Sequence, residues 1–179
     1  MNLQEAAVWI DGLFPGEMDI DQVGDFHVAS FAADGQHIAV TLDFQQVDTH
    51  LEADGRDVRV ELFTVAQQAT GLPELLESTA GLIKSMAIQP QPGVLVPGAG
   101  ALANVGITTS HCLLVVPFPW GGDVPNFKET GADGVDKLVL MLQVLPITDA
   151  ELAHLQAYGL AELQSALVAE GVDILDLQR

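Results

Sequence analysis

The sequence predicts an α+β fold: a single domain with a mixed, mostly antiparallel sheet and helices packed against it. Three observations support this prediction. Several apolar stretches have the length of strands, one pair of them flanks a tight-turn signal, and strands and helices do not alternate as in doubly wound folds. Because 49% of the 179 residues are apolar, one domain over residues 1–179 is expected to bury its own core.

The first quarter of the chain predicts a helix followed by a β-hairpin. Asn2–Glu5 has the spacing of a capping box, and apolar residues then recur at helical intervals up to Phe14. Two strand-like stretches, residues 26–33 and 37–43, flank the pair Asp34–Gly35, which is favoured in two-residue hairpin turns. The hairpin is expected to form part of the sheet.

The middle of the chain predicts a further strand and a central helix. In residues 57–65, apolar side chains alternate with Arg59 and Glu61, as in a strand with one buried face. Residues 73–86 begin with a proline and carry an apolar stripe at the helical period, so a helix packed on the sheet is expected. The Pro- and Gly-rich residues 89–106 are expected to form an ordered crossing loop.

The C-terminal part predicts two strands and a helical end. Apolar stretches at residues 112–118 and 137–144 have strand character, and a Gly- and Pro-containing loop, residues 119–134, separates them. Thr148–Glu151 repeats the capping-box spacing and marks the start of the last helical segment. Gly159 predicts a break or kink within that segment.

Acidic residues dominate the charge of the chain. The 25 Asp and Glu residues outnumber the 6 Lys and Arg residues, which gives a formal net charge of -19. Because unpaired carboxylates are costly to bury, the surface is expected to be broadly negative. Such a surface repels phosphate groups, so we expect neither nucleic-acid nor membrane binding. It attracts basic proteins, although acidity alone also serves solubility.

The single cysteine and the lengths of the apolar stretches indicate the cellular compartment of the protein. Cys112 lies in an apolar stretch, where a thiol is expected to pack as a small hydrophobe, and this suits a reducing environment. The start of the chain carries no basic segment ahead of an apolar one, and no apolar stretch approaches the ~18 residues that span a bilayer. The sequence therefore predicts a cytoplasmic protein.

Motifs for catalysis or cofactor binding are weak. Gly98–Ala103 matches the G-x-G-x-x-A string of dinucleotide-binding turns, but Gly106 curtails the helix that this mechanism needs. The histidines show no metal-ligand spacing. We therefore expect no cofactor, no metal and no enzymatic activity. The alternative is a small hydrolase or cofactor-binding protein that uses the Gly98–Ala103 loop or a carboxylate pair formed by the fold.

Two segments are candidates for contact with a partner protein: an aromatic loop at residues 120–128 and an acidic segment at residues 19–25. Aromatic anchors are enriched among interface hot spots, and carboxylates suit a basic partner. The candidate contact residues are Trp120, Asp123, Phe127, Asp19, Asp21 and Asp25. The alternatives are that the aromatic residues fold back on the core and that the acidic segment is a solvated loop.

The C-terminal third resembles the suppressor of fused family. An apolar strand runs into Pro146, Thr148 and Glu151 follow at the start of a helix, a Gly–Leu step lies at Gly159, and Arg179 stands near the end of a leucine-bearing segment. Physically, these matched residues are structural. Pro146 is expected to end the strand, Thr148 and Glu151 to cap the helix, and Gly159 to relieve the backbone at a helix junction.

The resemblance implies a non-enzymatic scaffold that binds another protein. Eukaryotic members sequester a transcription factor between two lobes, and bacterial members include immunity proteins that neutralise toxins. This chain has the length expected of the N-terminal lobe alone, so no partner-binding residue carries over. Its acidity fits an immunity protein with a basic toxin domain as partner. We expect a monomer or weak homodimer; a regulatory or structural subunit that pairs with itself through an apolar patch is a further alternative.

Overall fold

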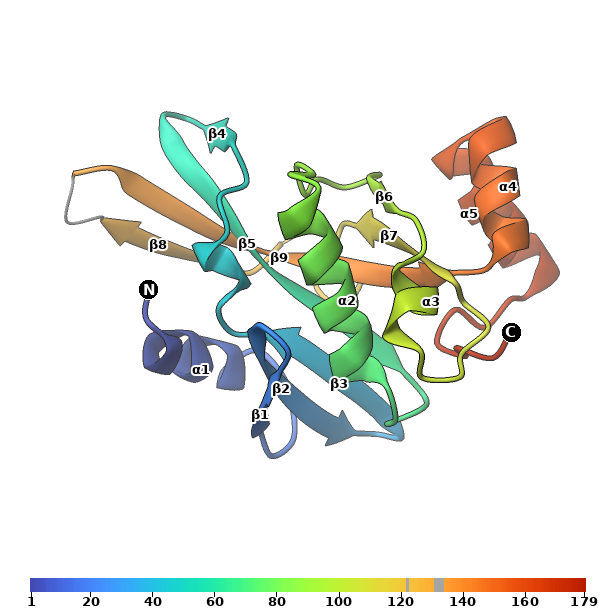
Figure 1. Cartoon of the computed structure of the whole chain (residues 1–179), viewed down its shortest axis with the longest axis horizontal. Coiled ribbons are helices and arrows are strands. Elements are labelled where there is room, and N and C mark those ends of the chain that lie inside the picture. Colours follow the sequence, from blue (N-terminus) through green and yellow to red (C-terminus); the bar gives the residue numbers. More distant parts are fainter. Residues whose placement is uncertain (122, 131–133) are drawn as a thin grey trace.

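The computed structural model describes residues 1–121, 123–130 and 134–179, and Figure 1 shows how its elements are arranged. The helices are α1 (Leu3–Asp11), η1 (Phe44–Gln46, a 3-10 helix), α2 (Leu72–Ser85), α3 (Ala99–Ala103), α4 (Asp149–Tyr158) and α5 (Leu160–Glu170). The strands are β1 (Asp19–Val23), β2 (Phe26–Ala33), β3 (Gln36–Thr41), β4 (Leu51–Ala53), β5 (Arg56–Ala66), β6 (Leu95–Val96), β7 (His111–Val115), β8 (Asn126–Thr130) and β9 (Asp136–Ile147).

The strands of the described residues form one nine-stranded sheet with β5 and β9 at its centre. The main order is β1-β2-β3-β5-β9-β7-β6, with β4 paired to β5 and β8 paired to β9. β5 and β9 run parallel, whereas the other pairings between described strands are antiparallel. The predicted α+β class, with a mixed and mostly antiparallel sheet, is confirmed.

The two central strands are long enough for each to pair with two strands along one edge. On β5, residues 63–66 pair with β3 and residues 56–58 pair with β4. On β9, residues 143–147 pair with β7 and residues 136–140 pair with β8. The first halves of β5 and β9, together with β4 and β8, therefore project as an arm, on the left of Figure 1.

Helices cover both faces of the sheet. Leu62 of β5 and Leu114 of β7 belong to the apolar cluster into which α2 packs. Their neighbours face the other way, because successive side chains of a strand alternate between faces. Phe63 packs with α1, and Val115 packs with Leu163 of α5. α1 and α5 thus share one face of the sheet, and α2 covers the other.

Local signals near the chain ends give the expected structures. Both predicted capping boxes form, one between Asn2 and Glu5 and one between Thr148 and Glu151. β2 and β3 form the predicted hairpin, and its turn Asp34–Gly35 has φ values of 53° and 76°. Two positive φ values are what a type I′ turn requires, and Asp and Gly tolerate them. No helix within the described ranges has the length and apolar character needed to cross a bilayer.

Two strands, β1 and β8, lie where loops are expected from the sequence, and a third, β4, lies where no element is predicted. Residues 19–23, expected as an acidic loop, form the edge strand β1, which is largely exposed. β4 and β8 are the short outer strands of the arm. Their polar and charged side chains give little apolar alternation, so the sequence pattern does not reveal them. Charged residues on exposed edge strands also discourage pairing with other chains.

Two strand ends differ from the prediction. The strand predicted to reach Phe118 ends three residues earlier, and the strand predicted to end at Val144 continues to Ile147. Pro146 therefore lies inside β9 instead of ending it. β5 pairs with β9 only as far as Gln143, so at Pro146 the strand has a neighbour on one side only. A residue without an N–H is tolerated at such a position.

Candidate partner-binding site

A pocket of about 590 Å³ opens on the sheet face that α1 and α5 share. Its wall comes from six separate parts of the chain: the segment after α1, the strands β3, β5 and β9, the segment after β7, and the tail after α5. Most of the lining is apolar. The lining residues are Leu13, Phe14, Pro15, Gln36, Ile38, Val65, Phe118, Pro119, Trp120, Gln143, Val172, Asp173, Ile174 and Leu175.

Trp120 forms one wall of this pocket by folding back on the core. Its ring lies edge-on to the rings of Phe14 and Phe63, with centroids 5.3 Å apart in both pairs. Aromatic pairs favour this geometry because the positive ring edge meets the negative ring face. Trp120 is therefore held in place by the core and keeps part of its surface open to the pocket.

Phe118 lies at the mouth of the pocket and remains 47% exposed. Its backbone N–H donates to Oε1 of Gln143 at 2.9 Å. Gln143 is only 4% exposed and also lines the pocket, so a buried carboxamide fixes the segment that carries Phe118. The strand prediction that included Phe118 gives no hint of this role, because the contact with Gln143 is set by the fold.

Phe118 also lines two adjoining pockets of about 310 and 250 Å³. The smaller of these shares Ile174 with the 590 Å³ pocket. We refer to the three together as the Phe118 crevice. Val116 and Val168 line it as well, and both are exposed although large and apolar. Contiguous exposed apolar surface of this kind is typical of an interaction site.

The charges around the Phe118 crevice are negative. Asp173 lines the main pocket, and the exposed acids that lie within three residues of a lining residue along the chain include Glu17, Asp34 and Asp123. Among the described residues, no Lys or Arg lines any of the three pockets. Four of the six cations lie on the strands of the arm instead, namely Arg56, Arg59, Lys128 and Lys137.

The aromatic loop singled out in the sequence is divided between two places. Asp123 lies next to Trp120, because its N–H donates to the Trp120 carbonyl at 3.1 Å. Phe127 lies on β8 of the arm and packs on Trp9 of α1, with ring centroids 5.9 Å apart. Trp120 therefore lines the Phe118 crevice and Asp123 lies beside Trp120, whereas Phe127 does not line the crevice.

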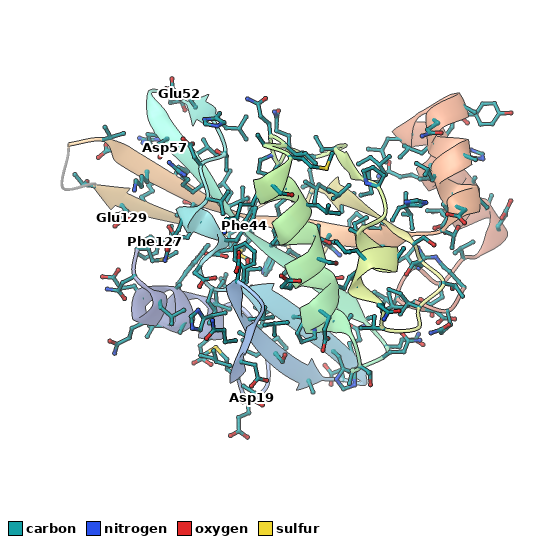
Figure 2. The ribbon with its side chains drawn as sticks, in the orientation of Figure 1. Asp19, Phe44, Glu52, Asp57, Phe127 and Glu129 are labelled. Carbon is teal, nitrogen blue, oxygen red and sulfur yellow. The ribbon has the colours of Figure 1, made fainter. Side chains whose placement is uncertain are left out.

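The acidic segment lies elsewhere. Asp19 and Asp21 are exposed on the edge strand β1, and Asp25 forms an ion pair with Lys84 of α2 at 3.0 Å. Figure 2 shows Asp19 and Phe127 in different parts of the molecule. The structure thus brings Trp120 and Asp123 together, and the other four candidate contact residues do not line the crevice.

The C-terminal motif residues converge on one arginine. The side chain of Glu151 accepts the Thr148 N–H at 2.7 Å and also pairs with Arg179 Nε at 2.9 Å. Arg179 donates further to the Pro146 carbonyl at 2.6 Å, which ties the end of the chain to the end of β9. Gly159 has a φ of 87° at the junction of α4 and α5, where a side chain would be strained. These residues hold the fold together and do not line the crevice.

The Gly98–Ala103 string has a packing explanation. Gly98 precedes α3, which is only five residues long, and its N–H donates to Nδ1 of His111 at 2.9 Å. A Cβ on Gly100 would lie 2.0 Å from the Thr109 carbonyl oxygen, so glycine is needed there for close backbone contact. The N–H of Gly98, at the start of this turn, is therefore already bonded within the protein.

His111 is not placed to act as a general base. Because its Nδ1 accepts the Gly98 N–H, the ring proton must lie on Nε2, which donates to Oδ1 of Asp149 at 2.8 Å. Both ring nitrogens are therefore engaged. The neighbouring cysteine, Cys112, is fully buried, and burial raises the pKa of its thiol to about 12, which suits a packing role.

Glu61 is a buried carboxyl group of β5 that lies outside the Phe118 crevice. It occupies the stretch of the strand edge between the parts paired with β3 and β4. Its oxygens accept the N–H groups of Phe44 and Gln45 at 3.2 Å each and bond the Thr41 hydroxyl. Burial raises the pKa of Glu61 to about 8, against hydrogen bonds that lower it. The side chain of Glu61 therefore fastens η1 to the sheet.

The fold and the crevice define an α+β protein with an apolar crevice on one face of its sheet. Comparison with known families makes this class specific: the model of the family "Suppressor of fused protein (SUFU)" matches residues 24–179. The chain belongs to the suppressor of fused family. The resemblance found in the C-terminal third is thus confirmed, and the match extends into the N-terminal part of the chain.

Two individual proteins are similar to this chain, one in sequence and one in fold. The chain is 25% identical over 140 residues to "Immunity protein YqcF" of Bacillus subtilis (strain 168), which covers 78% of this chain and 70% of that protein. Its fold is similar to that of a chain in "the Sufu-Fu complex crystal structure", with a TM-score of 0.60 and 9% identity, over 96% of this chain and 83% of the other. The second likeness is one of fold alone.

Proposed function

We propose that this chain is an immunity protein that binds a basic toxin protein and blocks it without catalysing a reaction. Membership of the suppressor of fused family supports a protein-binding role. The name of the similar Bacillus subtilis protein supports the immunity role in particular. The formal net charge of -19 supports a basic partner, because opposite charge speeds encounter and favours the correct orientation.

The Phe118 crevice is the observation that carries this proposal. It offers apolar and aromatic surface on a rigid sheet face, with acidic residues around it. Interfaces typically combine an apolar centre with a polar, charged rim. An enzyme site would need polar groups that converge on a substrate. His111 and the Gly98–Ala103 string, the features closest to such a site, are engaged within the protein.

Growth protection tests the proposal. The candidate toxin is the product of the gene adjacent to the one that encodes this chain, because immunity proteins are made together with the toxins that they neutralise. Expression of that product in a bacterial host should arrest growth, and co-expression of this chain should restore it. Continued arrest with both proteins present at comparable levels would rule out the immunity role for this pair.

A further inference from the structure

We infer that the Phe118 crevice receives one large apolar side chain from a basic segment of the partner protein. This inference rests on the proposed function and names the part of the partner that is recognised. The occupant is a protein segment in which Lys or Arg flanks an aromatic or large aliphatic residue. Size, hydrogen bonding and charge at the crevice each support this occupant.

The size of the pocket suits a single anchoring residue with its flanking backbone. The main pocket, of about 590 Å³, is walled by the fixed ring of Trp120 and by Phe118 and Ile174. Buried aromatic or aliphatic anchors that fill such preformed pockets supply most of the free energy in many interfaces. The pocket requires little rearrangement, because the core rings of Phe14 and Phe63 hold Trp120 in place.

One hydrogen-bond donor in the pocket is left for the occupant. Oε1 of Gln143 accepts the Phe118 N–H, so the carboxamide orientation is fixed and Nε2 carries the two donor hydrogens. No described residue bonds this Nε2, and the side chain lines the pocket although only 4% of the residue is exposed. An unpaired donor in the pocket lining favours an occupant that brings an acceptor, such as a backbone carbonyl beside the anchor residue.

Charge selects a basic segment over a neutral or acidic one. Asp173 lines the main pocket, and Glu17, Asp34 and Asp123 lie on the segments that form its wall. Within the described ranges, the lining holds no cation that would neutralise them or attract an acidic segment. Lys or Arg on both sides of the anchor would therefore meet carboxylates at the rim.

Binding of a defined peptide probe tests the inference. The probe is a capped peptide of two arginines, one tryptophan and two arginines, titrated by fluorescence anisotropy at low salt. Two control peptides carry serine in place of tryptophan or glutamates in place of arginines. The intact probe should bind at least about tenfold more tightly than either control, because each lacks one part of the recognition. If the serine peptide bound as tightly as the probe, the chain would recognise only the charge of the peptide. That result would overturn the inference.

Matched variants locate the site. Phe118→Ala should weaken probe binding by about tenfold, whereas Leu102→Ala, which truncates an exposed apolar residue on α3, should not change it. Asp34→Asn should weaken binding about twofold to threefold. Asp54→Asn is its control, because both aspartates precede a glycine in hairpin turns with positive φ, and Asp54 lies at the tip of the arm.

Growth protection separates failure of this inference from failure of the proposed function. If wild-type chain protects the host and Phe118→Ala protects equally well at the same protein level, the immunity role stands and the crevice is not the site. If wild-type chain gives no protection, the immunity role fails, and the probe measurements still decide whether the crevice binds a basic apolar segment. Loss of protection with Phe118→Ala but not with Leu102→Ala is the expected result.

Discussion

Glu61 sits in the core of a protein whose other carboxylates lie mostly at the surface. Its side chain is not exposed to solvent. The pairing of β3 with β5 stops at Phe63, and the segment with Phe44 and Gln45 covers the strand edge beside Glu61. No strand among the described residues pairs with this part of the β5 edge. The carboxyl group of Glu61 accepts the N–H groups of Phe44 and Gln45 there instead. The cost of burial is reduced by protonation, which is why the pKa of Glu61 rises.

This arrangement predicts a pH dependence of stability. Between pH 4.5 and about 8 the carboxyl of Glu61 holds its proton when folded and releases it when unfolded, so the free energy of unfolding should fall as pH rises. The slope from this one group is about 1.4 kcal/mol per pH unit. Glu61→Gln, which keeps the shape without the titration, should lose that part of the slope. Urea unfolding of both proteins at pH 5, 6, 7 and 8 measures it, and parallel pH profiles would contradict the account.

Local structures that depend on residues close together in the chain were predictable from the sequence. The capping boxes and the Asp34–Gly35 turn depend on neighbours within three residues, so their spacing in the sequence is enough. The burial of Glu61 was not predictable. Alternation places it on the polar side of its strand beside Arg59, and only the long-range contact with Phe44 shows that this side is covered.

At the scale of elements, the contact between α3 and the segment before β7 depends on a glycine. Gly100 approaches the Thr109 carbonyl so closely that Gly100→Ala should lower the free energy of unfolding by about 2–3 kcal/mol, because backbone must move to admit the methyl group. Chemical denaturation measures the change.

Gly81 provides the matched control. It lies within α2, has ordinary helical backbone, and leaves room for a methyl group, since the nearest atom would lie 4.0 Å from an added Cβ. Gly81→Ala should raise the free energy of unfolding by about 0.5–1 kcal/mol, because alanine is the better helix former. Equal effects of the two substitutions would show that Gly100 is not a contact glycine.

Element types were predictable where apolar periodicity is strong, as in α2, β5 and the hairpin of β2 and β3. The short strands β1, β4 and β8 were not, because their exposed and charged residues carry no such pattern. The structural role of Arg179, at the end of the chain, was also not predictable from the sequence. Arg179 joins Glu151 and the Pro146 carbonyl only because the tail after α5 returns to β9.

At the scale of the molecule, the main pocket of the Phe118 crevice arises from six separate parts of the chain. Trp120 and Asp123 could be selected from the sequence, because an aromatic residue beside an acid in a loop is typical of contact sites. Phe118, Gln143 and Ile174 could not, since each lies within or next to an element predicted for packing alone. The family match indicates a binding protein, whereas the surface that binds depends on how these parts meet.

The central claim is that the chain acts by binding and not by catalysis. The most direct measurement is titration of the purified toxin with increasing amounts of this chain, while the activity of the toxin is followed. A binding inhibitor should abolish activity at a ratio of about one to one, provided that the concentrations exceed the Kd. Inactivation of the toxin by a small fraction of an equivalent would show turnover and would contradict the account.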